Sequence, residues 1–166
     1  MVDPSPFEAL ELRPLRSADA PELRRILLSE PVRRWWGAPE PGFPESDEPE
    51  AERLTILYRG AVVGMIQFAE ERHPRYRHAT IDLFLDPALH GRGLGTEVLR
   101  RVLGHLVTER GHHRVTIDPA RANTAAVRAY EKAGFRAIGV MRAYEQDADG
   151  PEWHDGLLME FIADQP

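Results

Sequence analysis

The chain has 166 residues, of which 42% are hydrophobic and 29% are charged, and its formal net charge is −6. This length and composition predict one globular domain spanning residues 1–166, and the negative charge argues against a nucleic-acid partner while permitting a cationic substrate. Because the chain has no cysteine, disulfides and thiolate metal sites are excluded. We expect a cytoplasmic protein without a membrane partner, since no apolar run reaches spanning length and the first six residues do not resemble a secretion signal.

The first half of the chain predicts a strand, a helix and a hairpin, with a long loop between the helix and the hairpin. Apolar and polar residues alternate over 10–15, as in a strand, and Ser17 can cap a helix that runs to about residue 29. Residues 37–52 hold six prolines or glycines and six acids, which predicts a mobile acidic loop and not a linker between domains. The hairpin joins strands at 54–58 and 61–69 across Arg59–Gly60.

The second half alternates strands with helices. Apolar residues recur every three or four positions from Leu94 toward Gly111, which indicates a helix, and Asn123 can cap another that stops at Gly134. The remaining strands are predicted at 79–85, 114–118, 135–144 and 153–162, the last two as a hairpin with a long polar tip.

The segment 85–96 predicts a strand, a glycine-packed turn and a helix. Gly91, Gly93 and Gly95 remove side chains from the turn, so that backbone N–H groups can point together at an anion. The helix that follows adds its unpaired N–H groups and the positive end of its dipole, which suits a diphosphate. The alternative is a glycine-rich turn without a ligand. The spacing is neither that of a dinucleotide fingerprint nor that of a P-loop.

Two motifs together resemble the GCN5-related N-acetyltransferase (GNAT) family. The family's Gln/Arg-x-x-Gly-x-Gly/Ala signature is matched by His90-x-x-Gly93-x-Gly95, which departs from it only at His90. A second family element follows about thirty residues later, and its matching positions are Asn123, Ala126, Tyr130, Gly134 and Phe135. The resemblance implies an α/β (α+β) GNAT fold, with a mixed, mostly antiparallel central sheet of about seven strands flanked by about four helices. It also implies a sheet split near its centre to admit a pantetheine arm.

The family resemblance implies acetyl-CoA as the cofactor. Its pyrophosphate would lie over the N–H groups from Gly91 to Thr96, and its pantetheine arm would bond to the main chain of Leu83 and Leu85 as an added strand does. Asn123 could contact the cofactor through its amide or serve only as a helix N-cap. The residues implied in cofactor binding are Leu83, Phe84, Leu85, His90, Gly91, Arg92, Gly93, Leu94, Gly95, Thr96 and Asn123.

Catalytic roles are implied for Tyr130 and Asp82. A tyrosine at the position of Tyr130 often acts in this family as the general acid toward the coenzyme A sulfur, although the residue could equally be a helix-packing aromatic. Asp82 interrupts an apolar strand, where a carboxylate is costly to bury without a partner such as a ligand ammonium. The alternative for Asp82 is an exposed strand position.

The amine acceptor is narrowed by a resemblance to the aminoglycoside 6′-N-acetyltransferase branch. That branch carries matching aspartates, one as a base or amine anchor and one that binds substrate ammonium groups, which correspond here to Asp82 and Asp118. Asp118 could instead only end its strand at an Asp-Pro turn. Trp35 and Trp36 would join the substrate site or anchor the acidic loop.

Other functions stay open. The Trp-Trp region also resembles siderophore-assembly lysine N-acyltransferases, whose histidine–aspartate pair cannot be matched to His73, His78 or His154. Protein N-terminal or ribosomal-protein acetylation is a third possibility, and a coenzyme A-binding sensor without chemistry is a fourth. We expect no catalytic metal, because His112 and His113 are adjacent and would face opposite sides of a strand. A monomer and a homodimer are both compatible with the sequence.

Overall fold

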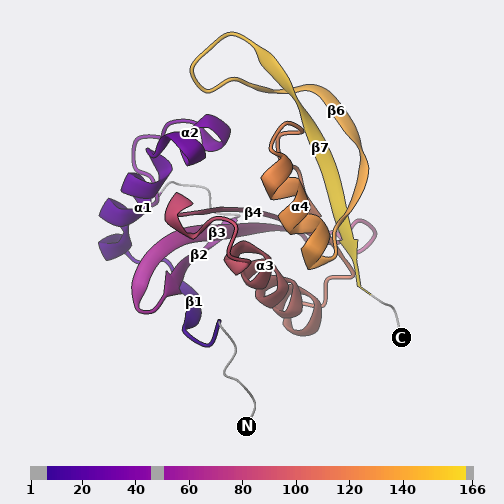
Figure 1. The fold of residues 1–166 in the computed structure, drawn as a ribbon. Coiled ribbons are helices and arrows are strands. Elements are labelled where there is room, and N and C mark those ends of the chain that lie inside the picture. Colours follow the sequence, from indigo (N-terminus) through magenta and orange to yellow (C-terminus); the bar gives the residue numbers. More distant parts are fainter. Residues whose placement is uncertain (1–6, 46–50, 164–166) are drawn as a thin grey trace.

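The chain is organised around a seven-stranded sheet with the order β1-β2-β3-β4-β5-β7-β6 (Figure 1). The computed structural model describes residues 7–45 and 51–163. The strands are β1 (Leu10–Pro14), β2 (Ala51–Tyr58), β3 (Ala61–Glu71), β4 (His78–Leu85), β5 (Arg114–Ile117), β6 (Arg136–Gln146) and β7 (Trp153–Ile162). All neighbouring strands are antiparallel except β4 and β5. The predicted mixed, mostly antiparallel sheet is confirmed.

Helices cover both faces of this sheet. They are η1 (Ser17–Asp19), α1 (Ala20–Leu27), α2 (Glu30–Trp36), η2 (Pro87–Leu89), α3 (Leu94–Gly104), the π-helical turn η3 (His105–Glu109) and α4 (Thr124–Ala133). Leu83 and Leu85 belong to the main core with residues of α3 and α4, whereas Phe84 belongs to a second cluster with residues of α1 and α2. This is the two-residue alternation of a strand buried on both sides. Among the described residues no helix is long and apolar enough to span a membrane.

The parallel pairing of β4 with β5 is short. Ala79 pairs with Val115 and Thr80 with Thr116, and the two threonine hydroxyls lie 3.0 Å apart. Beyond these two positions the described part of the chain gives β4 no further pairing with β5, so the sheet opens between the strands. The split predicted near the centre of the sheet is therefore present.

Two boundaries differ from the prediction in the first half of the chain. The helix predicted from Ser17 to about residue 29 is present, but its first turn is 3-10 helical and it ends at Leu27. A separate helix, α2, follows the extended residue Ser29 and was not predicted. Pro31 lies in the first turn of α2, where its missing N–H group would have no helical partner. Ser17 does not act as the cap. The acidic side chain of Asp19 accepts from the Arg16 N–H group instead.

The predicted acidic loop is shorter than 37–52. Strand β2 already begins at Ala51 and pairs with β3 through Ala69, so Glu52 belongs to the sheet. Part of the loop, 46–50, lies outside the described residues. The predicted turn at Arg59–Gly60 is present, with φ values of 54° and 78°. Positive φ values at both central residues match the turn to the right-handed twist of the two strands.

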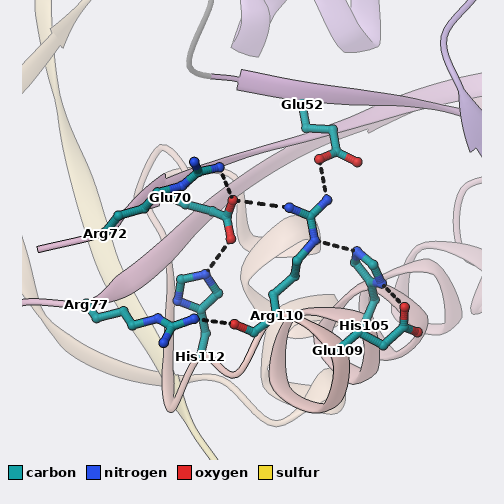
Figure 2. Close-up of polar contacts among 8 residues, drawn as sticks. All are labelled: Glu52, Glu70, Arg72, Arg77, His105, Glu109, Arg110 and His112. Atoms are coloured by element: carbon teal, nitrogen blue, oxygen red, sulfur yellow. Dashed lines mark hydrogen bonds and ion pairs between the residues drawn. The ribbon is translucent and has the colours of Figure 1, made fainter. Parts of the chain in front are cut away.

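A polar cluster fastens η3 and the loop before β5 to the ends of β2 and β3 (Figure 2). His112 Nε2 lies 2.7 Å from a Glu70 carboxylate oxygen, and Arg110 contacts Glu70 at 3.3 Å and Glu52 at 2.5 Å. The hydrogen bond from His112 is the largest of the effects that hold the pKa of Glu70 below its usual value. His112 is buried and His113 is exposed, as expected for neighbours that point to opposite sides, although both precede the strand.

Asp19 ties β1, η1 and β2 together from a buried position. Two Arg13 nitrogens donate to its carboxylate at 2.7 Å each, and the Thr55 hydroxyl donates at 2.7 Å. The Arg16 N–H group adds a fourth bond of 3.0 Å. The Arg13 guanidinium is the main reason that the pKa of Asp19 lies well below its ordinary range.

We predict that Asp19→Asn lowers the free energy of unfolding by about 2 kcal/mol at neutral pH, because it leaves the partly buried Arg13 guanidinium without its counter-charge. The folded-state pKa is lowered, so this stabilisation is complete above the unfolded pKa of about 4 and is lost as the pH falls toward the folded value. The difference between variant and wild type in urea melts should therefore shrink below about pH 4. Glu22→Gln, which breaks an exposed ion pair with Arg25, should cost less than about 1 kcal/mol. Equal losses for the two variants would contradict the assignment.

Candidate active site

The open edge of β4 lines the gap between β4 and β5. The Asp86 N–H group donates to Val63 O at 2.8 Å across the β3–β4 ladder. Because the direction of main-chain groups alternates in an antiparallel ladder, the N–H and C=O groups of Leu83 and Leu85 point away from β3, into the gap. This is the orientation that an added strand or an amide-rich arm requires.

Side chains at the rim already contact these main-chain groups. Asp82 Oδ1 accepts from the Leu83 N–H group at 2.9 Å, and Trp36 Nε1 donates to the Leu83 carbonyl at 3.2 Å. His90 Nε2 donates to the Leu85 carbonyl at 2.9 Å. The His90 ring therefore binds to the end of β4.

The glycine-packed turn has the conformation that the spacing predicted. Gly91 has a φ of 73°, and Gly93 has a φ of 80° and forms the N-cap of α3 without a side-chain capping bond. The first helical bond in the turn is made by the Glu97 N–H group to Gly93 O at 3.1 Å. The N–H groups of the first three helical residues, 94–96, therefore have no partner within α3.

The residues around this turn fit a diphosphate. Thr96 directs its hydroxyl to the Ala129 carbonyl at 3.3 Å, so it does not cap its own helix. Gly95 lets α3 approach the strand, since a Cβ there would lie 3.3 Å from Leu85 Cδ1. Arg92, at the tip of the turn, is exposed. Three unpaired N–H groups at the positive end of an eleven-residue helix form the kind of site that anions occupy.

Acidic side chains gather at the mouth of the gap. Asp82 lies on β4, Asp118 directly after β5, and Glu145 on β6. Burial of the Asp82 carboxyl raises its pKa to about 8, and the negative charges of Asp118 and Glu145 act in the same direction. The residue is nevertheless exposed to water, so the carboxyl is not part of the sealed core. The alternative predicted for Asp82, an exposed strand position, agrees with this exposure, and its role toward an amine stays a prediction.

Tyr130 on α4 lies close enough to these acids for their charges to act on it. Its side chain is 7% exposed, and its ring centre is 6.3 Å from that of Phe135. Burial, followed by the charges of Asp82 and Asp118, raises the pKa of the Tyr130 hydroxyl above its ordinary value. Within residues 7–45 and 51–163 the structure gives this hydroxyl no hydrogen-bond partner. Tyr130 is thus both a packing residue and a protonated phenol with an unused donor.

Two of the predicted residues follow β5. Asn123 caps α4, because its side-chain oxygen accepts from the Ala126 N–H group at 3.2 Å, and its amide nitrogen has no partner among the described residues. Asp118 accepts a hydrogen bond of 2.5 Å from the Tyr144 hydroxyl on β6. Tyr144 was not found from the sequence, because the two residues are 26 positions apart and no motif includes it.

The two tryptophans lie on α2. The Trp36 ring packs edge-on to Phe84 with centres 5.0 Å apart, and its N–H group is used by Leu83. Trp35 lies under the guanidinium of Arg34, 4.7 Å from its ring centre. Trp36 therefore packs α2 against the end of β4. Trp35 is half-buried.

Comparison with known proteins defines the class. The profile of the Acetyltransferase (GNAT) family matches residues 10–135, so the chain belongs to this family. The chain is 27% identical to an aminoglycoside N(6′)-acetyltransferase type 1 of Klebsiella pneumoniae, over 87% of this chain and 80% of that protein. The predicted family is confirmed, and the chain is an N-acetyltransferase that uses acetyl-CoA.

Solved structures share the fold at low sequence identity. The aminoglycoside acetyltransferase AAC(6′)-Ib in complex with coenzyme A and kanamycin is 21% identical, with a TM-score of 0.75 over 92% of this chain and 94% of that one. The spermidine N-acetyltransferase from Vibrio cholerae in complex with CoA and spermine is 20% identical, with a TM-score of 0.79 over 93% and 95%.

We predict that Gly93→Ala weakens binding of coenzyme A about tenfold or more, because a side chain at a φ of 80° is strained and would lie 3.4 Å from the Phe7 ring. Calorimetric titration of purified protein with coenzyme A measures this directly. Gly104→Ala, at the other end of α3 with open space around its Cβ, should bind as wild type does. Unchanged affinity in Gly93→Ala would remove the turn from the cofactor site.

Proposed function

We propose that the chain transfers an acetyl group directly to a primary amine of a small polycationic molecule of the aminoglycoside type. The observation that carries this proposal is the group of three carboxylates, Asp82, Asp118 and Glu145, beside the buried hydroxyl of Tyr130 at the gap between β4 and β5. The charges of Asp118 and Glu145 disfavour an ionised Asp82, and a cation placed between them would favour it. The named activity of the Klebsiella pneumoniae relative supports the same substrate class.

The cofactor site in this proposal consists of main-chain groups. The N–H groups of residues 94–96, with the glycine turn at 91–93, hold the diphosphate, and the edge of Leu83–Leu85 receives the amide groups of the arm. Asn123 offers its free amide N–H groups. Bound acetyl-CoA supplies an acetyl group activated as a thioester. The protein supplies alignment of the amine with that carbonyl, which lowers the entropic part of the barrier.

Asp82 acts as the base in this proposal. A primary amine arrives as an ammonium ion and must lose a proton before it can attack. A carboxylate with a pKa near 8 holds that proton far better than an ordinary aspartate does. The ammonium in turn favours ionised Asp82 until the proton is transferred.

Tyr130 acts as the acid. Its raised pKa keeps the phenol protonated at every physiological pH, and its hydroxyl has no competing partner within the described residues. It can therefore donate to the departing sulfur and avoid release of a free thiolate. The chain has no cysteine, and the two serines among the described residues, Ser17 and Ser29, do not lie on β4, β5 or α4. The proposal therefore has no covalent enzyme intermediate.

We predict that kcat/KM for the amine rises with pH through about 8 in wild type, because Asp82 must be deprotonated to act as the base. Asp82→Asn should lower kcat by about 10² and flatten this dependence. Tyr130→Phe should lower kcat while leaving the pH dependence and the KM for acetyl-CoA in place. Glu131→Gln, an acid elsewhere on α4, is the matched control. An Asp82→Asn enzyme with wild-type kcat would contradict the assignment of the base.

A panel of amines tests the acceptor class. Thiol release from acetyl-CoA is followed with kanamycin, spermidine, lysine and a peptide with a free N-terminus. We expect the highest kcat/KM with kanamycin, and a drop of about threefold to tenfold between low and physiological salt, because screening weakens attraction to the three carboxylates. Preference for lysine would favour the siderophore-type alternative, and preference for the peptide would favour protein acetylation. Binding of coenzyme A without thiol release in the presence of any of these amines would favour a coenzyme A-binding sensor.

A further inference from the structure

The hairpin of β6 and β7 carries an irregularity opposite the acidic side chains. Met141 pairs with Gly156 and Glu145 with His154, so four steps along β6 match only two along β7. Ala143 lies within the extra residues with a φ of 46°, and its N–H group donates to Asp155 Oδ1 at 3.0 Å. A strained residue held by a specific bond in a bulge is the kind of feature that redirects a neighbouring side chain.

The side chain that the bulge redirects is Tyr144. Its ring covers Gly156, where an added Cβ would lie 2.8 Å from Tyr144 Cδ1, so only glycine leaves room for it. From this position the Tyr144 hydroxyl donates to Asp118 Oδ2 at 2.5 Å. Nearly half of the Tyr144 side chain is exposed, so packing alone does not explain why the ring is held here.

The backbone on both sides of this contact is fixed. The Leu157 N–H group donates to Pro119 O at 2.9 Å, and the Arg121 N–H group donates to Asp155 O at 2.8 Å. These bonds tie the segment after β5 to β7. With the backbone fixed, the Asp118 side chain can still rotate. The charge-assisted hydrogen bond from Tyr144 restrains that rotation.

The tip of the same hairpin touches α2. Asp149 accepts from Arg33 at 2.5 Å, and a Cβ on Gly37 would lie 3.5 Å from Ala148. In Figure 1 the hairpin extends beyond the sheet and its tip bends toward α2. The strand that carries Tyr144 is therefore supported at both its base and its tip.

We propose that Tyr144 is a positioning residue for acceptor specificity, which fixes the Asp118 carboxylate so that its second oxygen receives an ammonium group of the acceptor other than the one that is acetylated. Asp118 Oδ1 has no partner among the described residues, and Asp82 takes the reacting amine. This inference rests on the proposed function. An Asp118 carboxylate held in this way favours acceptors with at least two amines over acceptors with one.

The test compares Tyr144→Phe, Asp118→Asn and the double variant with kanamycin and with a simple monoamine. Tyr144→Phe keeps the ring over Gly156 and removes only the hydroxyl. We expect its KM for kanamycin to rise about threefold to tenfold with kcat within about twofold, and the monoamine kcat/KM to stay within about twofold. In the Asp118→Asn background, removal of the hydroxyl should change the kanamycin KM by less than about twofold.

Tyr76→Phe is the matched control, since it removes an exposed hydroxyl from the turn between β3 and β4. Tyr144→Phe kinetics equal to those of Tyr76→Phe would overturn the inference, and so would an equal effect with and without Asp118. If wild type acetylates no polyamine, the proposed function fails as well. If wild type acetylates kanamycin and Tyr144→Phe has no effect, only the role of Tyr144 fails. The KM for acetyl-CoA and the thermal midpoint of each variant confirm that it is folded.

Discussion

The short pairing of β4 with β5 is the constraint on which the rest of the structure depends. The strands share two residue pairs and then separate, so the main-chain groups of the following residues of β4 lose the partners that a continuous sheet would give them. Unsatisfied backbone groups are costly in a protein interior. Asp82, Trp36 and His90 supply bonds to Leu83 and Leu85 instead. The opening is thus stabilised by side chains from three separate segments.

The acidic side chains beside the separated strands are a second unfavourable feature of the fold. Asp82, Asp118 and Glu145 repel one another, and the raised pKa of Asp82 records that repulsion together with its burial. The fold offsets part of the cost locally, since Tyr144 donates to Asp118. His154 Nε2 lies 3.4 Å from a Glu145 carboxylate oxygen and is a further partner. Asp82 has no cationic partner among the described residues, so a cationic ligand could compensate the rest. Stability given up in this way is typical of binding sites.

The residues of the proposed site come from two parts of the chain. The family profile matches residues 10–135, which include the glycine turn, Asn123 and Tyr130. Tyr144, Glu145 and Asp149 lie beyond that match, on the β6–β7 hairpin. Asp82 and Asp118 lie inside this match, so in the proposed site the hairpin adds Tyr144 and Glu145 to acceptor residues of the matched region.

The sequence by itself determined the strand order in the chain, the glycine turn before α3 and the Asn123 cap, because each depends on neighbours within a few positions. It placed Asp82, Asp118 and Tyr130 in one site only through the family resemblance. The helix α2 was missed, although a proline such as Pro31 is favoured in the first turn of a helix. Only the tertiary structure decided that Trp36 and His90 turn to β4, and that Tyr144 reaches Asp118. Trp36 and Leu83 are 47 positions apart in the sequence, and Tyr144 and Asp118 are 26 positions apart. These contacts depend on a bulge in the hairpin and on the separation of two strands, which the spacing of apolar and polar residues does not reveal.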